Sequence, residues 1–332
     1  MIRNLANNKL TGSIPPNLGN LTNLAILYLY GNQLAGLIPT DLENLKKLET
    51  LDLSYNQLTG PIPERLGNLK MLKTLDFSNN QLTGPIPCHL GRLDKLKTLD
   101  LSFNRLSGSI PVELGKLGKL EGLDLRENEL NGSLPKELGT LSNLQSVYLS
   151  SNYFTGNLPE EYKNIAAMES FYVNGNYLTG PFPKFVTEWV NLSVLDLGGN
   201  SFADDLPSEI FNMKNLQTLR VSDLNNNGFQ LQMPINLTKM STLVLRNCNI
   251  FGQIPSFIFD ENTNLRRLDL SFNNFTGEIP NSIRNLTAET MFLSGDEINQ
   301  RILRWINNTE TSTRGISYNK FTIDEAAVNN NV

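Results

Sequence analysis

The chain has 332 residues, of which 39% are hydrophobic and 18% are charged, and its formal net charge is −5 at pH 7. This weakly acidic balance gives no support to binding of nucleic acids or anionic membranes. The length alone would suggest two domains, but a regular internal repeat favours a single elongated body.

The repeat is most regular at residues 48–63, which read LETLDLSYNQLTGPIP, and it returns every 24 residues. One asparagine position recurs nine times without a slip: Asn8, Asn32, Asn56, Asn80, Asn104, Asn128, Asn152, Asn176 and Asn200. The same position continues, with a slip of one residue after the second member, as Leu224, Cys248, Asn273, Asp296 and Asn319. Self-similarity at this period indicates a leucine-rich repeat solenoid.

Each letter of the repeat has a physical reason. Leu51 and Leu53 point to the interior face of a short strand, while Asp52 and Ser54 point outward. The amide of Asn56 can pair with backbone groups of its own turn and of the next one, so stacked repeats form an asparagine ladder. Because one repeat cannot bury its own leucines, the repeats must stack.

We therefore predict an α/β solenoid over residues 1–323, with about 13–14 repeats that become irregular at 220–240 and after 285, followed by a disordered tail at 324–332. Leucines three residues apart, at Leu42, Leu45 and Leu48, predict a short helix or 3-10 turn opposite the strand. The LxGxIP form at 58–63, 82–87 and 106–111 resembles the plant-type repeat. That resemblance implies a second short strand and a right-handed curved superhelix, with the parallel β-sheet on the concave face and the helical turns on the convex side.

The two cysteines, Cys88 and Cys248, lie between six and seven repeats apart. At about 4.8 Å per stacked strand this separation is roughly 30 Å, whereas a disulfide needs α-carbons within about 7 Å. The spacing excludes a disulfide between them and predicts two buried, inert thiols. Cys248 takes the place of a ladder asparagine.

The ends of the sequence carry no targeting signal. Residues 1–4 are not followed by the apolar core of a signal peptide, and no run of about 18 apolar residues predicts a membrane span. The chain starts inside a repeat at 5–8, without the polar cap that a solenoid end requires. We therefore expect a fragment whose amino-terminal cap lies outside the sequence.

The carboxy-terminal half carries a second resemblance. Its segments read, in order, LRVSDL at 219–224, LVLRNC at 243–248, LDLSFN at 268–273, MFL at 291–293 and WI at 305–306. They are similar to plant receptor-like serine/threonine kinases whose ectodomain joins leucine-rich repeats to a malectin-like domain, and the likeness covers nearly the whole chain. The sequence departs from that pattern at 296–299 and between 307 and 315.

This resemblance implies an extracellular position at the plasma membrane, a protein, peptide or saccharide ligand, and a co-receptor kinase ectodomain as partner. The malectin-like, membrane-spanning and kinase parts are absent from these 332 residues.

Catalytic motifs are lacking. His89, the one histidine, follows Cys88, but two ligands do not make a zinc site and nothing nearby in the sequence adds a third. Phosphate-binding loops and kinase motifs are absent. An acidic column, Asp52, Asp76, Asp100 and Asp124, reads as four solvated residues of successive repeats. We predict a non-enzyme that uses no cofactor and no metal.

Two groups on the outward strand face are candidates for ligand binding. Tyr148 and Tyr172 occupy the same position of adjacent repeats, beside Arg126 and Glu127, and suit a peptide or a sugar ring. A basic strip that suits a carboxylate is formed by Arg220, Arg246, Arg266 and Arg267. An ordinary solvated surface is the alternative for both groups.

Glycosylation sequons predict a secretory route, although an asparagine-rich repeat creates some by chance. They begin at Asn20, Asn131, Asn191, Asn236, Asn274, Asn285 and Asn307.

Three functions fit the sequence. The first is a non-catalytic recognition module of a plant receptor-like kinase. The second is a soluble inhibitor of pathogen wall-degrading enzymes, although such inhibitors carry paired cysteines at both caps. The third is an intracellular interaction scaffold.

Overall fold

The computed structural model describes residues 1–231, 238–259, 264–285, 288–298, 313–315, 317 and 320. The chain divides into two compact units, Met1–Thr179 and Gly180–Val332. The tail expected at 324–332 and the ladder position Asn319 lie outside the described residues.

The first unit is a stack of coils whose main sheet is parallel throughout. Its strands, in spatial order, are β1 (Ile2–Asn4), β3 (Ile26–Tyr28), β5 (Thr50–Asp52), β7 (Thr74–Asp76), β9 (Thr98–Asp100), β11 (Gly122–Asp124), β13 (Ser146–Tyr148) and β15 (Ser170–Tyr172). The pairing register equals the repeat, so that Leu51 pairs with Leu75 and Leu75 with Leu99. These leucines are fully buried, which confirms the leucine-rich repeat solenoid.

A second parallel sheet runs through the LxGxIP segments, as the plant-type resemblance implies. Its strands are β2 (Thr11–Gly12), β4 (Gln33–Gly36), β6 (Gln57–Gly60), β8 (Gln81–Gly84), β10 (Arg105–Gly108), β12 (Glu129–Ser133), β14 (Tyr153–Gly156) and β16 (Tyr177–Leu178). The glycine of the motif bends the chain out of this sheet in the left-handed region, with φ of 74° at Gly60.

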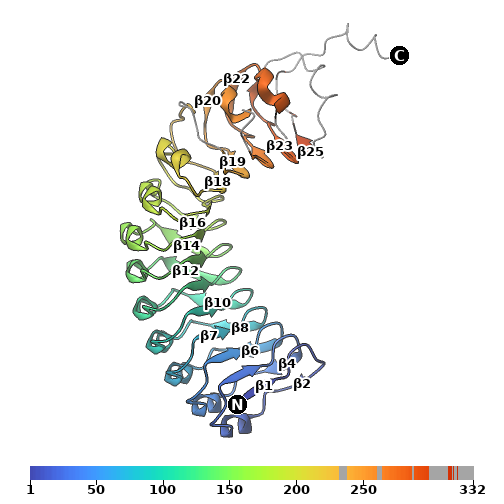
Figure 1. The fold of residues 1–332 in the computed structure, drawn as a ribbon, viewed down its shortest axis with the longest axis vertical. Helices are drawn as coiled ribbons and strands as arrows, with labels where there is room; N and C mark the ends of the chain where they lie inside the picture. The colour runs from blue at the N-terminus through green and yellow to red at the C-terminus, as the bar shows by residue number, and fades with distance from the viewer. Residues whose placement is uncertain are drawn as a thin grey trace, which may run out of the picture. The chain divides into compact units, whose positions relative to one another are not determined.

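The opposite side of each coil is a 3-10 turn. In the first unit these turns are η1 (Pro16–Asn20), η2 (Thr40–Asn44), η3 (Glu64–Asn68), η4 (Cys88–Arg92), η5 (Val112–Lys116), η6 (Lys136–Thr140) and η7 (Glu160–Asn164). Figure 1 shows them along one side of the first unit and the strands along the other. The predicted turn at Leu42 is therefore 3-10 rather than α, and Leu42 is fully buried in it.

Glycine sets how closely successive turns approach. Gly91 is the fourth residue of η4, and a Cβ built on it would lie 2.2 Å from the backbone oxygen of Glu113 in η5. Only a residue without a side chain permits that approach. The same position is glycine in five turns of the first unit (Gly19, Gly67, Gly91, Gly115 and Gly139).

The asparagine ladder forms as predicted. The Asn104 Nδ2 donates to the Leu101 oxygen at 3.1 Å and, across to the preceding repeat, to the Phe77 oxygen at 2.9 Å. Its Oδ1 accepts from the Leu82 N–H at 3.0 Å. Each amide therefore joins two coils through backbone groups that are buried away from water.

The polar residues of the strand are less exposed than predicted. Ser54 is only 4% exposed, and its hydroxyl donates to the Asp52 Oδ1 at 2.7 Å. Ser54 therefore shares a face with Asp52, as predicted, but it is buried rather than solvated, because its hydroxyl pairs with the carboxylate two residues earlier.

The second unit repeats the same plan. Its main sheet contains β17 (Val194–Asp196), β18 (Thr218–Ser222), β19 (Thr242–Arg246), β21 (Arg267–Asp269), β23 (Thr290–Phe292) and β25 (Thr313–Gly315). The second sheet contains β20 (Phe251–Gly252), β22 (Asn274–Gly277) and β24 (Glu297–Ile298), and the turns are η8 (Lys184–Glu188), η9 (Ser208–Asn212), η10 (Ser256–Phe259) and η11 (Asn281–Asn285).

The irregular segment at 220–240 lacks a second-sheet strand among its described residues. Isolated bridges join Pro181 to Ala203 and Ala203 to Asn225 instead. Leu224 is buried at the ladder position, where it has no amide to donate. Asn249 substitutes in part, because its Nδ2 donates to the Leu224 oxygen at 3.4 Å and the Asn226 oxygen at 3.2 Å.

Candidate ligand-binding face

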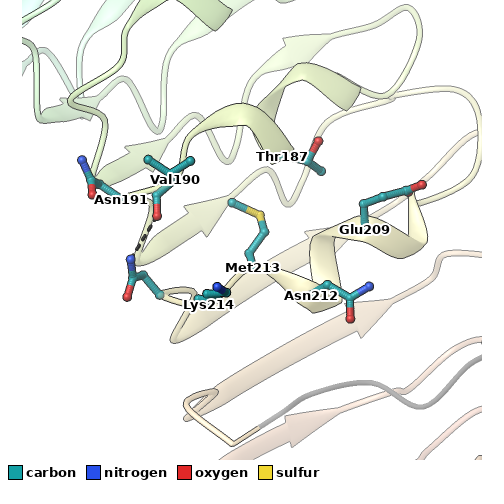
Figure 2. Close-up of a pocket in the computed structure, with 8 residues that line it drawn as sticks. Thr187, Val190, Asn191, Glu209, Asn212, Met213 and Lys214 are labelled. Carbon is teal, nitrogen blue, oxygen red and sulfur yellow. Dashed lines mark hydrogen bonds between the residues drawn. The ribbon is translucent and has the colours of Figure 1, made fainter.

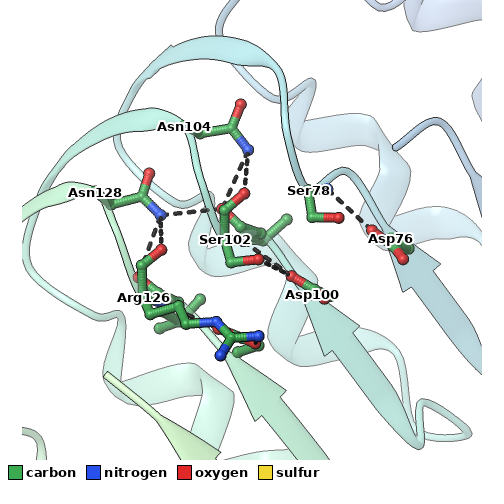
Figure 3. A network of polar contacts seen from close by, with 10 residues as sticks. Asp76, Ser78, Asp100, Ser102, Asn104, Arg126 and Asn128 are labelled. Atoms are coloured by element: carbon green, nitrogen blue, oxygen red, sulfur yellow. Dashed lines mark hydrogen bonds and ion pairs between the residues drawn. The ribbon is translucent and has the colours of Figure 1, made fainter. Parts of the chain in front are cut away.

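The main sheet of the first unit presents an acidic column on its outward face. Strand pairing puts Asp52, Asp76, Asp100 and Asp124 directly opposite one another on successive strands. In each carboxylate, Oδ1 accepts a backbone N–H from the residue two positions on, at 2.9–3.1 Å. Figure 3 shows Asp76 and Asp100 of this series together with the ladder asparagines Asn104 and Asn128.

These carboxylates are not the solvated residues that the sequence predicted. Asp124 is 8% exposed, and the other three are half-buried. Burial, with repulsion from Asp100, raises the pKa of Asp76 to about 6 and that of Asp124 to about 7. The prediction failed because it considered only the direction in which each side chain points. It did not consider how far neighbouring coils cover the carboxylates.

Aromatic rings and one guanidinium continue the column as a layered cluster, here called the platform, which consists of Phe103, Arg126, Tyr148 and Tyr172. Tyr148 pairs in register with Tyr172, and their rings stack with centroids 5.0 Å apart at 24°. The Arg126 Cζ lies 5.0 Å from the Tyr148 ring centroid and 5.6 Å from that of Phe103. Across four repeats the platform thus consists, in order, of one aromatic ring, one cation and two further aromatic rings.

Arg126 forms an ion pair with Asp124, the last aspartate of the acidic column. Its Nη2 lies 3.0 Å from the Asp124 Oδ2, and its Nε is buried without a hydrogen-bond partner. The side chain nevertheless keeps 42% of its surface exposed. The platform therefore offers solvent a partly exposed cation that is flanked by aromatic rings.

The structure separates the four predicted arginines of the second unit. Arg220 in β18 lies 3.4 Å from Asp196, measured from Nη1 to Oδ2, and Arg246 at the end of β19 stacks on Phe272 at 4.5 Å. Arg267 begins β21, and its charge acts on Asp196 to oppose the rise in pKa that burial causes there. Arg266 precedes the strand and is exposed outside the sheet. Three of the four predicted arginines therefore lie on the strand face, and Arg266 does not.

Sequence reasoning missed the two phenylalanines. Phe103 and Phe272 occupy the position before the ladder asparagine, where φ is positive (52° and 59°), and both are about 45% exposed. A large apolar residue at a position that usually holds a small or polar residue was the available signal. A second stacked pair was also missed: Tyr153 and Tyr177 on the second sheet, with centroids 6.1 Å apart.

Cys88 and His89 are the first two residues of η4, and the carboxylate of Glu64 from η3 lies beside them. The Cys88 Sγ lies 3.7 Å from the His89 Nδ1, and the Glu64 Oε2 lies 3.6 Å from the same nitrogen. Cys88 is exposed, so the prediction of a buried thiol was wrong there; Cys248 is buried as predicted. No group of three metal-ligating side chains with metal-site geometry occurs within the described residues.

A groove opens on the 3-10 side of the second unit. It has a volume of about 630 Å³ and is lined by Thr187, Val190, Asn191, Glu209, Asn212, Met213, Lys214 and Asn215. Thr187 occupies the turn position that Gly91 holds in η4, and Glu209 is the counterpart of Glu113. A side chain at this position keeps η9 away from η8, which explains the groove (Figure 2).

The predicted sequons divide by position. Asn20, Asn131, Asn191 and Asn274 are exposed, and Asn191 also lines the groove. Asn236, Asn307 and the side chain of Asn285 lie outside the described part of the chain. Within that part, no helix has the length and apolar character needed to cross a membrane.

Comparison with known proteins assigns the family. Residues 4–198, more than half of the chain, match the family described as Leucine-rich repeat region, and residues 191–213 and 264–286 match the Leucine Rich Repeat family. The chain belongs to the leucine-rich repeat family. This leucine-rich repeat protein is also 39% identical over 88 residues to the probable LRR receptor-like serine/threonine-protein kinase At1g53440 of Arabidopsis thaliana; the match covers 26% of this chain and 8% of that protein.

Two solved ectodomains share the fold. The LRR ectodomain of the Arabidopsis thaliana receptor kinase GASSHO1/SCHENGEN3, in complex with CASPARIAN STRIP INTEGRITY FACTOR 2, is similar at a TM-score of 0.90 and 35% identity, over 96% of this chain and 38% of that one. The Arabidopsis receptor kinase HAESA, in complex with the peptide hormone IDA and the co-receptor SERK1, is similar at a TM-score of 0.75 and 25% identity, over 98% and 62%. This leucine-rich repeat chain therefore has the fold of plant receptor ectodomains and spans less than two thirds of each of these relatives.

Proposed function

We propose that the chain is a non-catalytic recognition module of a plant receptor-like protein or kinase that binds an extended peptide on the strand face of the first unit. The platform carries this proposal. Stacked rings and a fixed guanidinium give a peptide apolar contact and a hydrogen-bond donor at one place, which is the composition of interface hot spots.

Three further observations support a peptide ligand. The HAESA structure, of the same fold, holds a peptide hormone. The platform residues come from four successive repeats, so an extended chain can contact them in sequence. The acidic column beside the platform suits basic residues of the same ligand.

The location and the parent protein belong to the same proposal. Exposed sequons at Asn20, Asn131, Asn191 and Asn274 fit the extracellular side of the plasma membrane. A parent with malectin-like and kinase parts rests on the resemblance of segments 219–306, and a co-receptor ectodomain is the partner that such a parent would use. The arginines of the second unit are a second candidate contact for a carboxylate.

The test is selection from a library of extended peptides displayed on phage, followed by affinity measurement on purified variants. Tyr148→Ala with Tyr172→Ala should weaken the selected peptides at least about tenfold, because truncating an aromatic hot spot costs about 2 kcal/mol or more. The matched control is Tyr153→Ala with Tyr177→Ala, which removes a stacked pair from the second sheet. Equal affinities for wild type and the Tyr148/Tyr172 variant would reject the platform as the site, and selective capture of wall saccharides would replace the peptide with a sugar.

A further inference from the structure

Asp124 stands at the junction of the acidic column and the platform. Its Oδ1 accepts the Arg126 N–H at 3.1 Å, and its Oδ2 pairs with the Arg126 Nη2 at 3.0 Å. The one cation of the platform is therefore tied to a carboxylate that is itself buried.

The neighbouring strands place further ionisable groups beside Asp124. Asp100 of β9 and Tyr148 of β13 are its register partners on the two sides, and Asp76 lies one strand beyond Asp100. Strands in a sheet lie about 4.8 Å apart. Across the described residues, Arg126 is the only cation that pairs with any of these three carboxylates.

Two opposing effects therefore act on Asp124. Arg126 favours the ionised form, whereas burial and the like charge of Asp100 favour the neutral form. Burial is the largest effect, so that the pKa of Asp124 rises to about 7. A proton can thus enter this pair within the range of pH that biological fluids cover.

We propose that Asp124, with Asp100 behind it, is a proton-controlled latch on Arg126 that decides which charge the platform accepts from a ligand. With Asp124 ionised, its carboxylate compensates the positive charge of the Arg126 guanidinium. The surrounding carboxylates then favour basic or neutral groups of a ligand. With Asp124 protonated, the charge-assisted bond to Nη2 is lost and the platform rings still hold the guanidinium. Arg126 is then free to bind an oxyanion of the ligand, such as a carboxylate or a sulfate.

This inference deepens the proposed function and rests on it only for the identity of the ligand. The latch itself is tested without a ligand, on the whole chain labelled with ¹⁵N-arginine. The Arg126 side-chain resonance, assigned by its loss in Arg126→Lys, is followed from pH 5 to pH 8.5 by NMR. The wild type should show one transition with a midpoint near pH 7.

Two variants identify the group that titrates. Asp124→Asn should abolish the transition, and Asp100→Asn should move it to lower pH because a like charge is removed. Arg246 of the second unit serves as an internal reference. An Arg126 resonance that stays constant over this range, or that titrates unchanged in Asp124→Asn, would overturn the latch. If Asp124→Asn does not fold, the pH midpoint of the Arg126 transition in Asp100→Asn alone decides whether the latch exists.

The charge preference is measured with two simple anions, acetate and sulfate, against chloride at equal ionic strength. Both should perturb Arg126 several-fold more strongly at pH 6 than at pH 8 in the wild type, and equally at both values in Asp124→Asn. A response to sulfate alone would assign the site to sulfate or phosphate esters rather than carboxylates. A pH-independent response would refute the change in preference. These results do not depend on peptide selection, so that a failed latch and a failed peptide site are distinguishable.

Discussion

Single asparagines decide whether neighbouring coils stay joined. Asn104→Ala removes a donor that serves the Phe77, Leu101 and Ser102 oxygens and the acceptor of the Leu82 N–H. Each buried group left unpaired costs about 1–3 kcal/mol, so the free energy of unfolding should fall by at least about 2 kcal/mol. Urea unfolding followed by circular dichroism measures the change.

Gln81→Ala provides the comparison, because Gln81 is exposed one residue after ladder position Asn80. It should change the free energy of unfolding by less than about 0.5 kcal/mol. Similar losses for the two variants would contradict the assignment of stability to the ladder.

Asp296 is an acid in the ladder position. Its Oδ1 accepts from the Asn273 and Phe275 N–H groups, both at 3.2 Å, and its Oδ2 is buried without a partner. Burial raises the pKa of this carboxyl from 3.8 to about 7. An asparagine would place a donor where Oδ2 now lies.

The raised pKa makes Asp296 destabilising at neutral pH. Below pH 3.8 both the folded and the unfolded states hold the proton, whereas between pH 3.8 and about 7 only the folded state does, so stability falls as pH rises through this window. Asp296→Asn should therefore stabilise the protein by about 2 kcal/mol at pH 7.5 and by much less at pH 4. Thermal melts at both values, with exposed Asp94→Asn as the charge-matched control, measure the difference; an equal gain at both would contradict it.

The sequence predicted which turns and strands form, but not how closely neighbouring turns approach one another. The 24-residue period predicted the main sheet, and leucines three residues apart predicted the turn at Leu42, because a side-chain pattern reports which residues are buried. The second sheet was implied only by the resemblance to the plant-type repeat. The groove beside Thr187 was missed, since it depends on how near two turns approach rather than on the pattern within either. The Glu64–His89 contact was missed for the same reason.

Glycine at the fourth turn position should be irreplaceable where the turns touch. Gly91→Ala forces a Cβ to within 2.2 Å of the Glu113 oxygen, so η4 and η5 must separate. Overpacking of this kind costs about 1–3 kcal/mol, and hydrogen exchange in both turns should accelerate. Gly118→Ala adds the same methyl where nothing lies within 4 Å and should be neutral; equal stability of the two variants would rule out the close-approach argument.

At the scale of the molecule, the proposed recognition surface and the interior that stabilises the fold lie on different faces of the same coils. Leucines and asparagines fill the interior at a fixed period, so the sequence could predict the fold almost completely. The platform takes one side chain from each of four successive coils, and its members are 22 to 24 residues apart in the chain. Tyr148 and Tyr172 could be found because they break the column of aspartates, and Arg126 because it stands two residues after Asp124, where neighbouring repeats have serine. Phe103 could have been found as well, from its large apolar side chain directly before ladder residue Asn104. The burial of Asp124 could not, since it depends on how deeply the aspartate column lies between neighbouring coils.

Photo-crosslinking of a selected peptide tests the location of the site most directly. A peptide that carries a benzophenone group is bound to the full chain and irradiated, and the attachment points are mapped by mass spectrometry. Crosslinks should concentrate in residues 100–104, 122–127, 146–148 and 170–172 and disappear when unlabelled peptide competes. Crosslinks that concentrate instead on the 3-10 turns or on the second sheet, around Tyr153 and Tyr177, would contradict recognition by the strand face.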